Sequence, residues 1–313
     1  IAGPWIESIQ LTKGTGSVAN GFESIAGQIN VELKKPETAE KLLGNVYVND
    51  QGKTDLNLNL ATILSNKWST ALLLHDNFAN KIVDMNMDGF KDLPTGNTVS
   101  IVNRYKYDNS KGVLGQFGVK VFDDRKLGGQ ITFNENKDKF TQNAYGLSIK
   151  TQRYELFGKL GYVFPQQKYK SIGLQLNAVD FNQASYFGLT NYNAKQQSVY
   201  SNLIYQSIIN STIHKFRTGL SFQYDKYKEG YKLINFARKE IVPGTFFEYT
   251  YTPNDKLSMV AGIRADNNNI YGAFVTPRLN IRYEPITGTV FRLSAGKGQR
   301  TANIFAENNS LFV

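Results

Sequence analysis

Apolar and polar side chains alternate along most of the chain after Pro36, in segments of about ten residues. Leu56, Leu58 and Leu60, for example, alternate with aspartate and asparagine, and the segment 275–284 repeats the pattern with arginine on its polar side. Because successive side chains of a strand point to opposite faces, each segment predicts a β-strand with one apolar and one polar face. About thirteen strands are expected in this way, which makes the fold all-β.

Aromatic residues mark both ends of one predicted apolar face. From residue 154 to residue 164 every second side chain is, in order, Tyr, Leu, Gly, Leu, Tyr and Phe. Ten steps of ~3.3 Å, tilted by about 45°, cover roughly 23 Å, which is close to the height of the apolar band of an outer-membrane barrel. A soluble β-sandwich also shows the alternation but does not need this spacing. The segment therefore favours a transmembrane antiparallel β-barrel.

The connections between the predicted strands alternate in length. Short turns are expected at 65–67, 108–112, 165–170, 210–212, 253–255 and 285–288. Longer links are expected at 77–97, 124–150, 183–195 and 225–243. Outer-membrane barrels have short turns at the periplasmic end and longer loops at the external end. We therefore expect all the short turns at one end of the barrel and all the long links at the other.

A glycine-rich segment precedes these strands. Two extended runs, 6–12 and 28–33, flank a stretch rich in Gly, Ser, Ala and Asn, where glycines permit tight turns and close packing. A phosphate-binding loop is excluded, because Gly14-x-Gly16 is not followed by Gly-Lys-Ser/Thr or by a helix-forming run. The order I-E-x-I-x-x-x-K-G-x-G-S, closed by G-x-I-N-V, resembles the C-terminal end of the plug domain of TonB-dependent outer-membrane receptors. The residues assigned to this plug motif are Lys13, Gly14, Gly16, Gly21, Gly27 and Asn30.

Several positions depart from the family pattern. Lys13 stands where Arg is usual, Thr15 stands where Pro is usual, Phe22–Glu23 stands where an aromatic–Gly pair is common, and Ala26–Gly27 replaces a Gly pair. The resemblance implies that residues 1–36 are the C-terminal part of a plug domain. Residues 37–313 would then be the N-terminal portion of a transmembrane β-barrel, part of a larger family barrel of about 22 strands. Such a barrel lies in the bacterial outer membrane, in contact with its lipid.

The resemblance also implies active import without chemical conversion. Receptors of this family bind a scarce ligand outside the cell, and TonB with its inner-membrane energising complex drives rearrangement of the plug. The plug pattern is more similar to the classical siderophore and vitamin receptors than to glycan importers that work with a surface lipoprotein. A siderophore or other metal chelate is therefore the expected ligand, and the TonB-contacting box is expected N-terminal to this chain. The alternative is a passive or structural barrel, or a barrel subunit of a larger surface complex.

The composition agrees with an envelope protein. The 313 residues carry a net charge of +10 and no cysteine, so the chain offers neither a disulfide framework nor a thiolate metal site. No apolar run approaches the roughly 18–20 residues of a membrane-spanning helix. Lys and Arg are spread over every segment without a nucleic-acid motif, so no nucleic-acid partner is expected. The chain opens at Ile1 without Met or a signal peptide, and we interpret it as a fragment of a longer precursor.

One segment, 84–92, has the side-chain spacing of a calcium-binding loop. Oxygen-bearing side chains stand at positions 1, 3, 5 and 9, Gly89 stands at position 6, and position 7 offers its carbonyl oxygen. The expected Ca²⁺ ligands are Asp84, Asn86, Asp88, Phe90 and Asp92. Thr95 replaces the bidentate Glu of position 12, and the flanking segments are predicted strands, so the loop would not be an EF-hand. The alternative is an acidic, solvated surface loop with an Asp-Gly turn.

Five arginines fall on the polar faces of predicted strands and are expected to point into the barrel lumen. They are Arg217, Arg264, Arg278, Arg282 and Arg292. A basic lumen would attract an anionic ligand such as a metal chelate. The interpretation we favour is that these arginines pair with acidic groups of neighbouring strands and of the plug, because isolated charges in a lumen need partners. Glu7, Glu23 and Glu32 are the acidic residues on the plug side.

Aromatic residues gather in the predicted outer loops, where they either form a rim for ligand docking or pack the loops together. They are Tyr186, Phe187, Tyr192, Tyr227, Tyr231 and Phe236. An enzyme is not expected. His75 and His214 stand alone, and no nucleophile motif adjoins either of them. His75 beside Asp76 is the one pair that an outer-membrane hydrolase could use.

Overall fold

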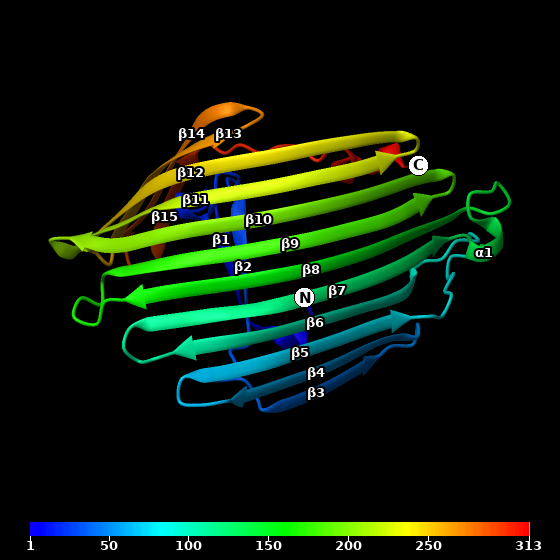
Figure 1. Ribbon diagram of the computed structural model, residues 1–313, viewed down its shortest axis with the longest axis horizontal. Helices are drawn as coiled ribbons and strands as arrows, with labels where there is room; N and C mark the ends of the chain where they lie inside the picture. Colours follow the sequence, from blue (N-terminus) through cyan, green and yellow to red (C-terminus); the bar gives the residue numbers. More distant parts are fainter. Residues whose placement is uncertain (313) are drawn as a thin grey trace.

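The computed structural model describes residues 1–312 and consists mainly of antiparallel strands (Figure 1). A sheet of thirteen strands runs in chain order from β3 to β15, and each strand pairs with its sequence neighbours. Its strands are β3 (Leu42–Val48), β4 (Lys53–Ile63), β5 (Trp68–Ala79), β6 (Thr95–Asp108), β7 (Val113–Gly129), β8 (Gly146–Val163), β9 (Ser171–Phe187), β10 (Thr190–Ile209), β11 (Ser211–Tyr231), β12 (Ile234–Asn254), β13 (Leu257–Asn268), β14 (Gly272–Ile286) and β15 (Thr289–Gly296). The predicted all-β fold is confirmed, and the sheet is a partial barrel with β3 and β15 at its edges.

The N-terminal segment, residues 1–36, forms a separate two-stranded sheet. Strands β1 (Ile6–Lys13) and β2 (Gly27–Leu33) pair antiparallel, and Figure 1 shows them crossing behind the large sheet. The sheet face that contacts this segment is called the inner face below, and the opposite face the outer face. In the structure, the predicted plug segment lies against one face of the curved sheet. The boundary between residues 36 and 37 stays a prediction.

Short helices complete the described chain. They are η1 (Gly3–Trp5), η2 (Val18–Asn20), α1 (Glu135–Asp138), α2 (Ile304–Glu307) and η3 (Asn309–Leu311). None of the helices within residues 1–312 is long and apolar enough to cross a membrane.

The alternation of the sequence corresponds to the two faces of the sheet. On β4, Leu56, Leu58 and Leu60 are exposed on the outer face, whereas Asn59 is only 3% exposed on the inner face. On β8, Tyr154 and Leu156 are 50% and 56% exposed on the outer face. An outer face of exposed leucine and tyrosine is the expected surface of a strand that contacts lipid.

The two ends of the sheet differ as the connection lengths predict. The six predicted short turns all lie at one end, from the turn between β4 and β5 to the turn between β14 and β15. The opposite end carries the loops 80–94 and 130–145. By the family's pattern the first end is periplasmic and the second external.

Two predicted long links are wrong. Within 183–195, strands β9 and β10 continue until only Gly188 and Leu189 connect them, and within 225–243, β11 and β12 meet at Lys232 and Leu233. Their polar residues still alternate and still pair across strands, so the hairpins extend beyond the apolar belt. A strand needs paired backbone groups rather than apolar side chains, which explains why a polar stretch was mistaken for loop.

Candidate functional site

The N-terminal segment is held on the inner face mainly through residues 16–19, which we call the anchor segment. Glu248 on β12 is 2% exposed and binds it from the wall. Ser17 Oγ donates to Glu248 Oε2 over 2.6 Å, and the Val18 backbone N–H donates to the same oxygen over 3.2 Å. Arg217 on β11 pairs with the other carboxylate oxygen. Both oxygens of this buried charge are therefore satisfied, and one of them is committed to the N-terminal segment.

Two buried arginines hold the carbonyl groups of the same segment. Arg264 on β13 donates to Val18 O over 3.3 Å and forms an ion pair with Asp266 at 2.6 Å. Arg278 on β14 donates to Gly16 O over 3.1 Å and to Ser17 O over 3.0 Å. The wall thus offers both a carboxylate for N–H and O–H donors and guanidinium groups for carbonyl acceptors.

Apolar contacts accompany these polar ones. Val18 and Ala19 of helix η2 are buried against Phe246, with Ile204 packed beside them. Gly262 lies directly beneath, where an added Cβ would come within 2.6 Å of Val18 Cγ2. The absence of a side chain at this position lets the anchor segment approach the backbone of β13.

A second contact holds the other end of the N-terminal segment. Trp5 is 1% exposed and packs with Leu73 and Val102 of the wall. Arg104 on β6 donates to the carbonyl oxygens of Leu33 and Lys34, both over 3.2 Å. Neither Arg104 nor Glu248 was singled out from the sequence. In the sequence, each is only a charged residue on the polar side of an alternating strand. Many other charged residues occupy such positions.

The five predicted lumen arginines all point to the inner face. Arg217 and Arg264 pair with Glu248 and Asp266, and Arg282 pairs with Glu284. Their carboxylate partners belong to the barrel wall. Among the ion pairs of residues 1–312, none joins these arginines to Glu7, Glu23 or Glu32.

A cavity of about 670 Å³ separates the N-terminal segment from the wall next to the anchor segment. Its lining includes four basic side chains and one carboxylate, namely Lys13, Arg217, Arg282, Arg292 and Glu248. Most of its other polar lining residues are serines, threonines and an asparagine. The excess of positive charge makes this space favourable for an anion.

The glycines of the plug-like motif serve the turn between β1 and β2. Gly14 and Gly27 have φ of 85° and 137°, in the region that favours glycine. At Gly27 an added Cβ would lie 2.8 Å from the carbonyl oxygen of Thr12. Gly21 also has a positive φ, 111°, at the end of η2. Asn30 lies in β2 and donates to Gln10 Oε1 over 3.2 Å, so it contributes to the small sheet.

The tip of the N-terminal segment approaches the chain after β15. Gln299 donates its backbone N–H to Phe22 O over 3.2 Å, and Phe22 packs edge-on against Phe274. Burial raises the pKa of the neighbouring Glu23 carboxyl above its ordinary value, and the positive charge of Arg300 offsets part of this effect. Phe22 is thus the buried contact of the tip, whereas Ile25 remains 48% exposed.

The predicted outer aromatics divide into two groups. Tyr192, Tyr231 and Phe236 contact Phe305 of α2, with ring centroids 4.9 to 5.9 Å apart. Phe312 packs on Phe187, Tyr192 and Tyr231. Tyr186 instead packs under the loop 130–145 and donates to Glu135. Tyr227 lies beneath the Arg238 guanidinium at 4.3 Å. The segment 304–312 thus covers the group formed by Phe187, Tyr192, Tyr231 and Phe236.

The loop 84–92 folds around its own side chains. Asp84 accepts the backbone N–H groups of Asp88 and Gly89 over 3.2 and 3.0 Å, and Asp92 accepts that of Met85 over 2.7 Å. Asn86 and Asp88 accept from the next turn of the loop, and Phe90 forms a bridge with Gln130. In the part of the chain that the structure describes, no three His, Asp or Glu side chains converge as a metal-ligand cluster. Calcium binding by this loop stays a prediction.

The two histidines occupy different faces. His75 Nδ1 lies 2.8 Å from Asn57 Oδ1 on the inner face, beside Trp5. Asp76, the next residue of β5, points to the outer face because side chains alternate along a strand. His214 contacts the ring of Tyr249 near the periplasmic end of β11. The neighbours His75 and Asp76 therefore do not form a pair.

Comparison with known proteins agrees with this geometry. Residues 36–311 match the family described as TonB dependent receptor-like, beta-barrel. The chain therefore belongs to the TonB-dependent receptor family, whose barrels lie in the bacterial outer membrane. A comparison with curated protein sequences gave no match.

Solved structures share the fold. The siderophore receptor PirA from Acinetobacter baumannii is 13% identical with a TM-score of 0.69, and the match covers 95% of this chain and 48% of PirA. FpvA from P. aeruginosa, bound to a heterologous pyoverdine and iron, is 12% identical with a TM-score of 0.70, covering 93% and 46%. A mutant of the ferric enterobactin receptor PfeA from Pseudomonas aeruginosa, in complex with enterobactin, is 11% identical with a TM-score of 0.70, covering 96% and 50%. The chain spans about half the length of these receptors.

Proposed function

We propose that the protein takes part in the TonB-dependent import of a small anionic ligand, such as a metal chelate, across the outer membrane. The observation that carries the proposal is the anchor segment, held on the inner face by Glu248, Arg264 and Arg278. Import past a plug requires that the plug be held firmly at rest and released when energy is supplied. A few directional contacts between plug and wall meet both requirements.

The energy of these contacts supports an energised step. Five hydrogen bonds join the anchor segment to charged side chains of the wall. Hydrogen bonds to charged groups contribute about 1.5–3 kcal/mol each. Thermal motion therefore seldom breaks all five together. A force transmitted to the N-terminal side of the segment, as TonB and its inner-membrane complex would supply, could break them in succession.

The ligand class is inferred from charge. The cavity beside the anchor segment has four basic side chains and one carboxylate, so an anion would be favoured along this wall. Receptors with the same fold are described as siderophore receptors, including PirA, and FpvA was solved with a pyoverdine–iron complex. These names belong to those proteins, but together with the basic cavity they support a ferric chelate as the ligand of this one.

The test is an uptake measurement in cells that produce the complete protein. Cells with and without TonB are given a panel of ⁵⁵Fe-labelled chelates, and cell-associated iron is measured over time. The proposal expects uptake that saturates, needs TonB and stops when the proton gradient is dissipated. Uptake that is equal in cells with and without TonB would instead support a passive barrel.

A matched pair of variants ties the result to the anchor segment. Glu248→Gln removes the charge that Ser17 and Arg217 share, whereas Asp50→Asn removes an exposed charge in the turn between β3 and β4, away from the cavity and the anchor segment. Only Glu248→Gln is expected to change the rate of TonB-dependent uptake.

A further inference from the structure

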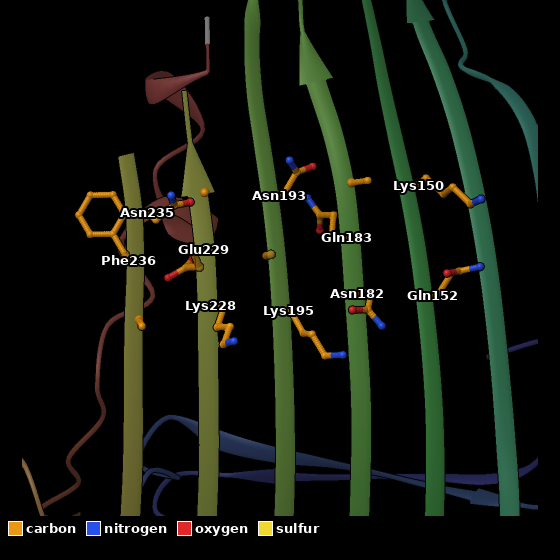
Figure 2. Close-up of a pocket in the computed structure, with 14 residues that line it drawn as sticks. Lys150, Gln152, Asn182, Gln183, Asn193, Lys195, Lys228, Glu229, Asn235 and Phe236 are labelled. Carbon is orange, nitrogen blue, oxygen red and sulfur yellow. The ribbon is translucent and has the colours of Figure 1, made fainter. Parts of the chain in front are cut away.

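A groove on one face of strands β8 to β12 combines several lysines with amide side chains (Figure 2). It has a volume of about 660 Å³. One row of directly paired residues crosses its five strands as Gln152, Asn182, Lys195, Lys228 and Ala237. The next row towards the external end contains Lys150, Ala184, Asn193, Gly230 and Asn235. Paired residues of neighbouring strands point to the same side, so both rows share one face.

This face is the outer one. Along β8, Lys150 and Gln152 continue the alternate positions that lead to the exposed Tyr154 and Leu156. Lys195 in the same way stands four residues from Val199, which is 44% exposed. The groove therefore opens to the side on which the barrel meets lipid, away from the N-terminal segment.

Its height matches the lipid head groups. Four residues at ~3.3 Å each, tilted by about 45°, place a lysine roughly 9 Å beyond the corresponding residue of the apolar belt. Lys150 and Lys228 stand at this distance from Tyr154 and Tyr224. The polar layer of a bilayer extends roughly 5–8 Å beyond its hydrocarbon core on each side. The lysine backbones therefore lie at or just beyond this polar layer, and their flexible side chains can extend back to the depth of the lipid phosphates.

Two carboxylates neutralise only part of the charge in this groove: Asp180 accepts from Asn182, and Asp123 accepts from Gln152. Lys195 lies 3.6 Å from Asp180 and is 47% exposed. Within residues 1–312, Lys150 and Lys228 have no ion-pair partner. Lys226 and Lys239, which pair directly across β11 and β12, add two more positive charges on the same face.

Small residues leave room for a ligand among these lysines. Ala184, Gly230 and Ala237 occupy the positions between the long side chains, so the centre of the groove is shallow and open. The amide group of Asn193 lies beside it and can donate hydrogen bonds to oxygen atoms, whereas the Asn182 amide already donates to Asp180 over 2.8 Å. Figure 2 shows Lys150, Lys195 and Lys228 on three different strands. Their positive charges are therefore spread over a wider area than one small anion would contact.

We propose that this groove, the outer lysine groove, binds the phosphate groups of an anionic lipid in the external leaflet of the outer membrane. A lipid fits better than free phosphate, because the groove is continuous with the apolar outer face on which acyl chains would lie. Each lysine near a membrane surface adds an attraction to anionic head groups that salt weakens. The bound lipid would hold the long β9–β12 hairpins upright above the membrane.

The test measures lipid binding to the detergent-solubilised protein by native mass spectrometry. The probe is a bisphosphorylated diglucosamine lipid, compared with zwitterionic phosphatidylcholine and with inorganic phosphate. The wild type is expected to retain the bisphosphorylated lipid selectively. The triple variant Lys150→Gln/Lys195→Gln/Lys228→Gln is expected to bind it roughly a hundredfold more weakly, since three surface lysines are lost.

Two further variants separate position from charge and from folding. Lys111→Gln/Lys168→Gln/Lys256→Gln removes the same charge from exposed turns at the periplasmic end, and it should bind as the wild type does. Lys150→Arg/Lys195→Arg/Lys228→Arg keeps the charge and should retain binding. Equal binding by the wild type and the groove triple variant would overturn the proposal. So would an equal loss in the periplasmic control, or displacement of the lipid by submillimolar inorganic phosphate.

Discussion

Ser17 Oγ donates a hydrogen bond of 2.6 Å to Glu248 Oε2, a contact between residues 231 positions apart in the chain. Arg217 holds the opposite oxygen of the same carboxylate. The small N-terminal sheet and the wall of the barrel are thus joined through one buried charge. Predictions about the resting position of the N-terminal segment follow most directly from this contact.

Glu248→Gln should loosen the anchor segment without unfolding the barrel. Ser17 Oγ and the Val18 N–H both donate to this charged carboxylate, and hydrogen bonds to charged groups contribute about 1.5–3 kcal/mol each. Hydrogen exchange should therefore become at least tenfold faster at the backbone amides of residues 16–20, whereas the strands β8 to β11 keep their protection. Unchanged exchange at these amides would mean that Glu248 does not hold the segment.

Gly262→Ala should also displace the anchor segment, for a steric reason. The added Cβ would meet Val18 Cγ2 at 2.6 Å, and overpacking of this kind costs about 1–3 kcal/mol. The double variant Gly262→Ala/Val18→Ala should recover most of the loss, because the shortened side chain makes room. Gly44→Ala is the matched control, since nothing lies within 4 Å of a Cβ at that position. The rate of proteolysis within the N-terminal segment measures how far the segment is displaced in each of the three variants.

Docking of the segment's tip should depend on pH through Glu23. Burial raises the pKa of this carboxyl in the docked state above its ordinary value of 4.5. A raised pKa means that docking binds protons. The contribution of Glu23 to docking is therefore complete below pH 4.5 and is lost as the pH rises through the raised pKa of the docked state. Amide protection at residues 20–26, corrected for the intrinsic exchange rate, should therefore fall as the pH rises above 4.5.

Glu23→Gln provides the comparison for this pH effect. Its protection at residues 20–26 should not vary with pH in this way, and near neutral pH it should exceed that of the wild type, since no partly desolvated charge must form. An identical pH profile in the two proteins would show that Glu23 does not carry the pH dependence.

The loop 84–92 should bind Ca²⁺ weakly if the predicted ligand set is correct. Extracellular calcium-binding modules bind in the range of about 10⁻⁴ to 10⁻³ M, and fewer charged ligands weaken the affinity. Millimolar Ca²⁺ should then protect this loop from proteolysis, and a chelator should remove the protection. Asp84→Asn should abolish the effect, whereas Asp50→Asn in the neighbouring turn should not. A calcium-independent cleavage rate in the wild type would refute the prediction.

The strands and their two faces were readable in the sequence because a period of two residues is a local property. Leu56 and Asn57 face opposite sides of β4 whatever the rest of the chain does. The arrangement of short turns at one end follows from the same count, because each strand reverses direction. The plug-like glycines were visible too, since Gly27 needs a backbone conformation that other residues rarely adopt.

The tertiary structure alone decided which polar residues matter. Glu248 and Arg104 differ from other inner-face residues only in what lies opposite them, and that depends on how the sheet curves around the N-terminal segment. The extended hairpins of β9 to β12 were likewise invisible, because backbone pairing rather than apolar burial maintains them. Alternation in the sequence determined the faces of each strand. Contacts between residues more than 200 positions apart required the folded barrel, because no local pattern encodes which distant group a side chain will meet.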